Sequence, residues 1–399
     1  MMTLAYLAIE TKAHSIGEVW ARLIGDDSKW IVDLTLTALC FSCCVYCSSF
    51  IGDISISLSS ATNLSGLFSN RASMLIIVTI GLLAPLCFLG NLSDLQGSSV
   101  LGVLGVLSTV LIHIRRLIDK SYVPGHQIYD NLPEMKRPSW DVETSSHYFG
   151  GKLNLFGINK GTLILLNAIC VAFLGHHNAL EYYKKLRNAS PQRYKNTILT
   201  AYGAVFSIST IMMIIGYCIF GRTVQPNILN NFHGFKDKLA TSARILTGTA
   251  ISLAYPVVFS GLRSSLFELI NLNSHPKYLR DIVSVVVLTV ITFIACKYSD
   301  NNVGVILGIM GSFLGCVTAY ILPAILRLAY MNKQKRRQGL FPRQNQLEVL
   351  LNHFLLSFGI MFSILGLFMT LEEIKKGGSR TLSEMLLQQG VTTMESTSS

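Results

Sequence analysis

Long apolar runs dominate the pattern of this chain. Nine stretches carry almost no charge, at residues 31–50, 72–93, 95–114, 161–180, 196–221, 245–262, 282–296, 301–326 and 349–371. A bilayer core about 30 Å thick is crossed by ~20 apolar residues in a helix, whereas a helix of a soluble protein shows a polar face along its length. The pattern therefore predicts an all-α polytopic membrane protein with nine full spans. The apolar residues 1–9 add half a span at the N-terminus.

Composition and charge agree with a membrane protein. Only 14% of the 399 residues are charged, compared with roughly 25% in soluble domains. The net charge is +11, but the positive residues lie in connections between spans, so we predict the lipid bilayer as partner and no nucleic acid. Residues 181–195 and 327–343 are rich in Lys and Arg and are separated by four spans. The positive-inside rule places both connections on the cytosolic side.

The span at residues 161–180 is interrupted by polar residues. Gly175, His176, His177 and Asn178 follow one another where a lipid-facing helix would carry leucines. Polar groups at this depth face a bundle interior or a water-filled path. Glycine and asparagine allow a helix to unwind, and the freed main-chain groups can then bind a ligand. A histidine can also carry a proton near neutral pH, and a histidine packed between helices is the competing interpretation.

Other spans offer further candidates. Pro256 lacks a backbone donor and can kink its helix, while Tyr255 beside it could bind substrate and Ser252 could ligate a cation. Tyr46 and Asp53 lie two helical turns apart on one face. Tyr46 could line a pathway, with packing as an equal alternative, and for Asp53 we predict a structural role at the membrane edge.

Catalytic and metal-binding patterns are missing from the sequence. The nine cysteines all fall in or beside spans, and the group at Cys40, Cys43, Cys44 and Cys47 has no second cluster at ligand spacing. Small apolar packing explains it better. The chain has no paired carboxylates, Ser/His/Asp set or phosphate loop at catalytic spacing. We therefore predict neither an enzyme nor a bound cofactor or metal.

Several fragments resemble the amino acid/auxin permease family in family order. They include Ser15-Ile-Gly-Glu-Val-Trp20, Phe50-Ile-Gly-Asp53, Phe173-Leu-Gly-His176 with Tyr183-Lys-Lys-Leu186, Tyr255-Pro256, and Leu322-Pro323-Ala324. The resemblance covers nearly the whole chain. It implies a LeuT-like bundle with a five-plus-five inverted repeat and the substrate at mid-membrane. Relative to that family the chain looks N-terminally truncated, because helix one is missing and helix two is a stub.

The resemblance implies a secondary active transporter of amino acids built from residues 1–371, with residues 372–399 as a disordered tail. Its implied substrate-binding residues are Gly175, His176, Asn178, Tyr46, Ser252 and Tyr255, and His176 would couple transport to protons. Sodium-coupled relatives tend to carry threonine where this chain has Ala254, so sodium coupling is disfavoured. A transport-incompetent paralogue that acts as amino acid sensor or partner subunit is the alternative. Vacuolar or other endomembranes and the plasma membrane both fit.

Overall fold

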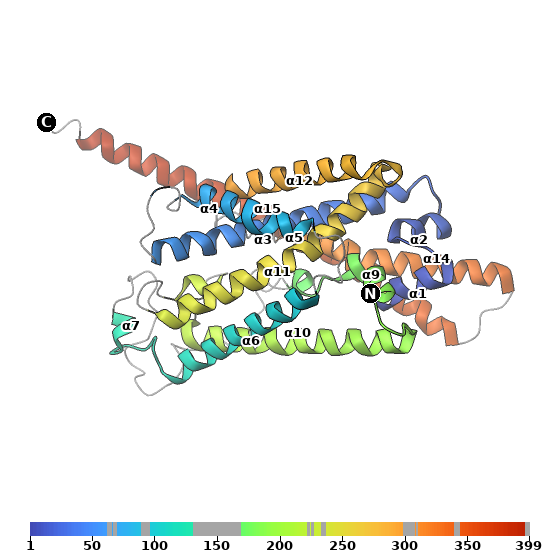
Figure 1. Ribbon diagram of the computed structural model, residues 1–399, viewed down its shortest axis with the longest axis horizontal. Coiled ribbons are helices and arrows are strands. Elements are labelled where there is room, and N and C mark those ends of the chain that lie inside the picture. Colours follow the sequence, from blue (N-terminus) through green and yellow to red (C-terminus); the bar gives the residue numbers. More distant parts are fainter. Residues whose placement is uncertain are drawn as a thin grey trace. The chain divides into compact units, whose positions relative to one another are not determined.

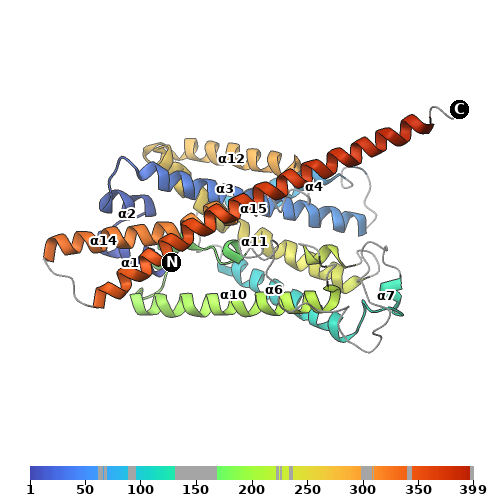
Figure 2. The same cartoon turned by 180° about the vertical axis from the view of Figure 1, so that it is seen from behind.

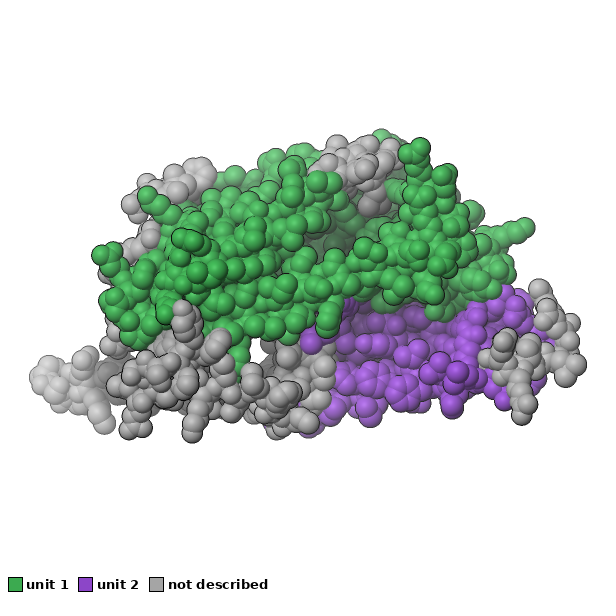
Figure 3. Space-filling view, turned by 90° about the horizontal axis from the view of Figure 1, so that it is seen from below, with its two compact units in different colours: residues 1–157, 175–303 green, residues 158–174, 304–399 purple. Residues whose placement is uncertain are grey.

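The computed structural model describes residues 1–61, 66, 70–88, 96–130, 169–221, 224, 227–232, 237–297, 308, 310–338 and 344–395. Helices of several kinds make up the regular structure of these residues, which contain no strand (Figure 1). The chain divides into two compact units, shown in different colours in Figure 3. The first comprises Met1–Gly157 and Gly175–Val303, and the second comprises Ile158–Leu174 and Gly304–Ser399.

Three long helices form the centre of the first unit. Helix α11 (Lys238–Leu269) packs against both α3 (Lys29–Ala61) and α6 (Gln96–Ile118), as Figure 1 shows. A small-residue stripe on α6 makes its contact with α11 close, since a Cβ on Gly105 would lie 3.0 Å from the Leu246 carbonyl oxygen. Such residues let two backbones approach one another in a membrane.

An arginine connects α3 to two neighbouring helices. Arg71 begins α4 (Arg71–Val78), which continues through the π-helix η2 (Thr79–Leu83) into α5 (Ala84–Cys87). Its Nε lies 2.5 Å from Asp53 Oδ1, and its Nη2 donates to the Ser49 carbonyl oxygen at 3.0 Å. Its Nη1 donates to the Ala295 carbonyl oxygen at 2.7 Å, on α12 (Lys277–Lys297). The structural role predicted for Asp53 is therefore confirmed.

The start of α11 is held by a buried carboxylate. Asp237 accepts a hydrogen bond from the Ala240 amide at 2.9 Å and another from the Tyr122 hydroxyl at 2.8 Å, and it pairs with Arg116 at the end of α6. Tyr122 and the rings of Phe220 and Phe232 pack edge to face. Phe220 ends α10 (Pro191–Phe220), so this cluster joins three long helices at one end of the unit.

Short helices complete the first unit. Near the N-terminus lie α1 (Met2–Thr11) and α2 (Ile16–Leu23), and Ser15 Oγ caps α2 by accepting from the Glu18 amide at 3.1 Å. The remaining short elements are α7 (Gln127–Asp130), η4 (His176–Asn178), α9 (Ala179–Lys184), η6 (Ile228–Asn230) and η7 (Leu272–Ser274).

The second unit holds the last two spans. Two π-helices, η8 (Met310–Gly315) and η9 (Val317–Ile321), lead into α14 (Leu322–Gln338), and α15 (Gln344–Glu395) packs on all three (Figure 2). The backbone of α15 is helical through Glu395, and the disorder expected for residues 372–399 stays a prediction.

Among the described residues, seven helices are long and apolar enough to cross a membrane. They correspond to seven of the nine predicted spans. The span predicted at residues 72–93 corresponds to the shorter apolar helix Arg71–Cys87, and residues 161–168 of the span predicted at 161–180 lie outside the described residues. Exposed apolar side chains support the assignment of these helices as membrane spans. On α10, Leu199, Phe206 and Ile214 are each more than half exposed. The inverted repeat implied by the family resemblance stays a prediction.

Candidate functional site

The helix interruption predicted at Gly175 is present. Before it, the Phe173 and Leu174 amides donate to the carbonyl oxygens of Ile169 and Val171. Helical geometry then stops, and Gly175 (φ −135°, ψ 10°) leads into the single 3-10 turn η4. Regular helix resumes in α9 at Ala179. The amides and carbonyls at this interruption are freed from an α-helical ladder, which is the condition for ligand binding by main-chain groups.

The resumed half of this helix is attached to two long helices. Asn178 is 3% exposed, and its Nδ2 donates to the Val257 carbonyl oxygen on α11 at 3.2 Å. The Tyr194 hydroxyl of α10 donates to the Ala179 carbonyl oxygen at 2.7 Å. The two bonds join the residues at the start of α9 to α11 and α10, so they stabilise the broken conformation.

Helix α11 has its own irregularity at the same level. Pro256 supplies no amide hydrogen, so the helical donor to the Ser252 carbonyl oxygen is missing. The Val257 carbonyl oxygen, one residue further on, accepts from Asn178 and also from Ser260 Oγ at 2.9 Å. The proline of α11 therefore lies beside the interruption after Gly175.

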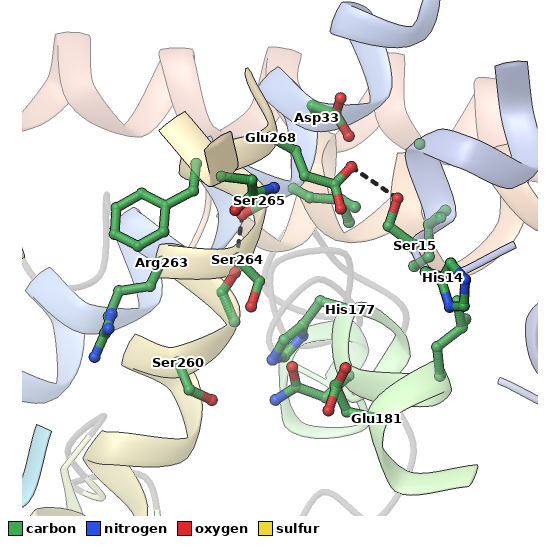
Figure 4. A pocket seen from close by; sticks show the side chains of 18 of the residues that line it. His14, Ser15, Asp33, His177, Glu181, Ser260, Arg263, Ser264, Ser265 and Glu268 are labelled. Carbon is green, nitrogen blue, oxygen red and sulfur yellow. Dashed lines mark hydrogen bonds between the residues drawn. The ribbon is translucent and has the colours of Figure 1, made fainter. Parts of the chain in front are cut away.

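A cavity of about 570 Å³ lies between these elements and the N-terminal helices, as Figure 4 shows. Its walls come from α11, from η4 and α9, from the start of α3, and from the residues that lead into α2. Ser15 Oγ donates to Glu268 Oε2 at 2.7 Å across the cavity, and Lys29 Nζ lies 3.4 Å from the same oxygen. These contacts connect α2 and α3 to the end of α11.

The cavity is lined by charges of both signs. Its acids are Asp33, Glu181 and Glu268, and its bases are His14, His177, Lys185, Arg263 and Arg280. Arg263 is directed away from Glu268 (Figure 4) and donates to the Cys87 carbonyl oxygen at 3.3 Å. A lining with both charges and several serine hydroxyls suits a small dipolar solute better than an apolar or purely anionic one.

The predicted site residues fall into three groups. Asn178 lines the cavity, whereas Gly175 lies beside Met1 and Tyr202, whose Sδ and Oη atoms would each be 3.4 Å from a Cβ on Gly175. His176 is half-buried next to Gly175 and does not line the cavity.

The second group is on α11. Ser252 Oγ donates to the Gly248 carbonyl oxygen at 2.8 Å within its own helix. Tyr255 is fully buried, and its Oη accepts from Ser48 Oγ at 3.2 Å on α3. Both residues lie within one turn of Pro256, which lines the cavity, but neither lines it.

Tyr46 forms the third group by itself. It is half-buried on α3, where its ring packs against Phe50 with centroids 6.3 Å apart. It does not line the cavity. This ring contact corresponds to the packing role that the sequence offers for Tyr46 as the alternative to lining a pathway.

Sequence reasoning missed Ser15, Asp33, Gly261 and Glu268 as cavity residues. For Asp33 and Glu268 the sequence does offer an indication. Each is an acidic residue within about two turns of the end of a predicted span. At that position a contact with lipid headgroups is the usual interpretation. The structure buries Asp33 to 3% exposure against Gly17, where a Cβ would overlap the Asp33 carboxylate. Only the fold brings these two span ends together.

The fold and the cavity define an integral, multi-pass membrane protein with a polar site between helices. The chain belongs to a family of transporters: the model of the family described as transmembrane amino acid transporter protein matches residues 3–371. It is similar to the sodium-coupled neutral amino acid symporter 2 of Danio rerio, with 22% identity over 274 residues. That match covers 68% of this chain and 54% of the relative, so the chain spans about half of the relative's length.

Proposed function

We propose that this protein is a secondary active transporter that moves α-amino acids across a membrane. The observation that carries the proposal is the interrupted helix at Gly175–Asn178, docked on a proline-containing helix beside a polar cavity. Broken helices present main-chain dipoles to small substrates inside a membrane. Membership of a transporter family supports this reading.

An amino acid zwitterion matches the groups that surround the interruption. Freed amides at the start of η4 and α9 can bind a carboxylate, because helix starts attract negative charge. The acids of the cavity provide partners for an ammonium group. Gly175, His176, Asn178, Ser252, Tyr255 and Tyr46 remain our candidates for substrate contact.

For coupling we propose protons, with His176 as the carrier. His176 Nδ1 is buried without a hydrogen-bond partner among the described residues, so a proton there would not displace an existing bond. The Danio rerio relative is named as sodium-coupled, which makes sodium the direct competitor. Ala254 argues against sodium, because a methyl group cannot ligate a cation and this residue is exposed and outside the cavity lining.

The test is uptake of a labelled amino acid panel into proteoliposomes. We expect accumulation driven by an inward proton gradient and unchanged when sodium is replaced by choline. His176→Ala should flatten the pH dependence of uptake between about pH 5 and 8, the range in which histidine titrates. His353→Ala is the matched control, because His353 is exposed on α15.

Three results would contradict parts of this proposal. Uptake that needs sodium and ignores the proton gradient would reject proton coupling. An unchanged pH profile in His176→Ala would reject His176 as carrier. Saturable binding without any uptake would reject transport and support a sensor.

A further inference from the structure

His177 and Asn178 both make a close contact with Gly261 of α11. A Cβ on Gly261 would be 2.9 Å from His177 Cδ2 and 3.0 Å from Asn178 Oδ1. Both distances are shorter than ordinary contacts, so the two side chains rest directly on the glycine backbone. His177 and Asn178 on one side and Gly261 on the other therefore form one tight crossing of η4 and α11.

His177, Asn178 and Gly261 all line the cavity, and Figure 4 shows the His177 ring extending towards the part of α11 that carries Ser260 and Ser264. On α11 the cavity continues from Gly261 to Pro256. On the α3 side the cavity reaches Asp33 and Leu36 but not Cys40, one turn further into the bundle.

Cys40 lies immediately behind the crossing. Its Sγ would be 3.5 Å from the same Cβ on Gly261, and the residue is 1% exposed. By contrast Ser264, on the cavity side of α11, is exposed. A small movement of His177 and Asn178 away from Gly261 would therefore join the cavity to the layer of Cys40 and the neighbouring buried residues.

We propose that His177 and Asn178 are gating residues that close the inner end of the transport path by resting on Gly261. The proposal rests on the proposed function, since a gate needs a path. Two contacts keep the gate shut: the steric fit on Gly261, and the hydrogen bond from Asn178 Nδ2 to the Val257 carbonyl oxygen. The cavity is then the inner vestibule, on the side of the basic connection at residues 181–195, which the positive-inside rule places in the cytosol.

Cys40 itself can report whether the gate is open. A membrane-impermeant methanethiosulfonate reagent is applied to the cytosolic face of sealed inside-out vesicles that contain the full chain. Fragment-ion mass spectrometry then measures the modification rate of each cysteine separately. Ser264→Cys supplies a thiol on the vestibule wall as the positive control. We expect this thiol to react rapidly and Cys40 to react slowly.

Opening the gate should expose Cys40 selectively. Asn178→Ala removes one buried hydrogen bond and should raise the Cys40 rate about tenfold, the equilibrium change that such a bond supports. His177→Ala should raise it in the same direction by removing the larger side chain. His14→Ala is the matched control, since His14 also lines the cavity but lies outside the crossing.

Two outcomes would overturn the gate. One is a Cys40 rate equal to that of Ser264→Cys in the otherwise unchanged chain, and the other is a slow Cys40 rate unaltered by both His177→Ala and Asn178→Ala. The labelling does not depend on uptake, so a failed gate can be told from a failed transporter. Uptake without the labelling pattern removes the gate alone, whereas the labelling pattern without uptake removes the transport function.

Discussion

At the scale of single residues, Arg71 shows how this bundle accommodates a charge inside a mostly apolar protein. Its guanidinium group bonds to one carboxylate and to carbonyl oxygens of two helices, and both side chains of the Arg71–Asp53 pair are less than one-fifth exposed. A buried pair of this kind adds little over an apolar replacement of both partners, but the loss of one partner leaves the other charge uncompensated.

Replacement of Arg71 should therefore cost much more than replacement of an exposed arginine. We expect Arg71→Met to destabilise the protein by roughly 3–5 kcal/mol, because Asp53 would stay buried and unpaired. Asp53→Asn should restore part of this loss in the double variant. Thermal unfolding in detergent measures both effects.

The control for Arg71 is an exposed ion pair. Arg115 pairs with Asp119 on the surface of α6, and its side chain is 65% exposed. Surface pairs contribute little, so Arg115→Met should leave the unfolding temperature nearly unchanged. Equal effects of the two substitutions would refute the role assigned to Arg71.

Residue types alone identified the break after Leu174 but not which of its side chains meet the cavity. Neighbouring residues in a 3-10 turn point in very different directions, so one position decides which environment a histidine enters. His177 rests on Gly261 and lines the cavity, whereas His176 does neither. Likewise the cavity role of Glu268 depends on Ser15, more than two hundred residues away in the chain.

At the scale of elements, α11 organises the first unit. It contacts α3 and α6 along its length, receives Asn178 beside Pro256, and begins at the Asp237 cap. Its apolar run and its proline were readable from the sequence. The same sequence could not show that the proline and the interruption after Leu174 lie at one level, because their contact is long-range.

Restoring the missing donor in α11 should separate stability from transport. Pro256→Ala returns an amide hydrogen to the Ser252 carbonyl oxygen and should stabilise α11 by up to about 3 kcal/mol, the usual cost of an interior proline. We expect turnover of uptake to fall, because a straight α11 would move the Val257 carbonyl oxygen that holds Asn178. Unfolding temperature and uptake kinetics, measured on the same preparation, check both effects.

A control for Pro256 is the half-buried Leu253, three residues earlier in α11. Leu253→Ala changes side-chain volume in the same helix without a change of backbone donors. It should leave turnover close to that of the parent chain. Should Pro256→Ala transport as fast as the parent, the irregularity of α11 has no part in the cycle.

At the scale of the whole molecule, helix number fixes which connections share a side of the membrane. Four candidate spans separate the α9–α10 connection from the end of α14. Of the spans predicted from the sequence, the interrupted one at residues 161–180 alone lies between the α6–α7 region and the α9–α10 connection. The lengths of most spans follow from hydropathy alone, whereas the π-helical segments of η2, η8 and η9 have no comparable sequence signal.

The orientation can be measured with single introduced thiols. Asn188 and Arg336 are exposed, on the side predicted to be cytosolic, and Pro124 is exposed on the opposite side. We expect Asn188→Cys and Arg336→Cys to react with an impermeant maleimide in inside-out vesicles, and Pro124→Cys to react only after permeabilisation. Reaction of Asn188→Cys and Pro124→Cys from one side would contradict an odd number of crossings between them.

The bonds of Arg71 also set an order of events for the ribosome and the insertion machinery. The carbonyl oxygen of Ala295 that Arg71 requires is synthesised 224 residues later. Until α12 has been inserted, the guanidinium group of Arg71 lacks the acceptor that the Ala295 carbonyl oxygen supplies in the folded protein. Chains that stop before α12 should therefore be retained by chaperones and degraded, because Arg71 has no Ala295 carbonyl oxygen to bind.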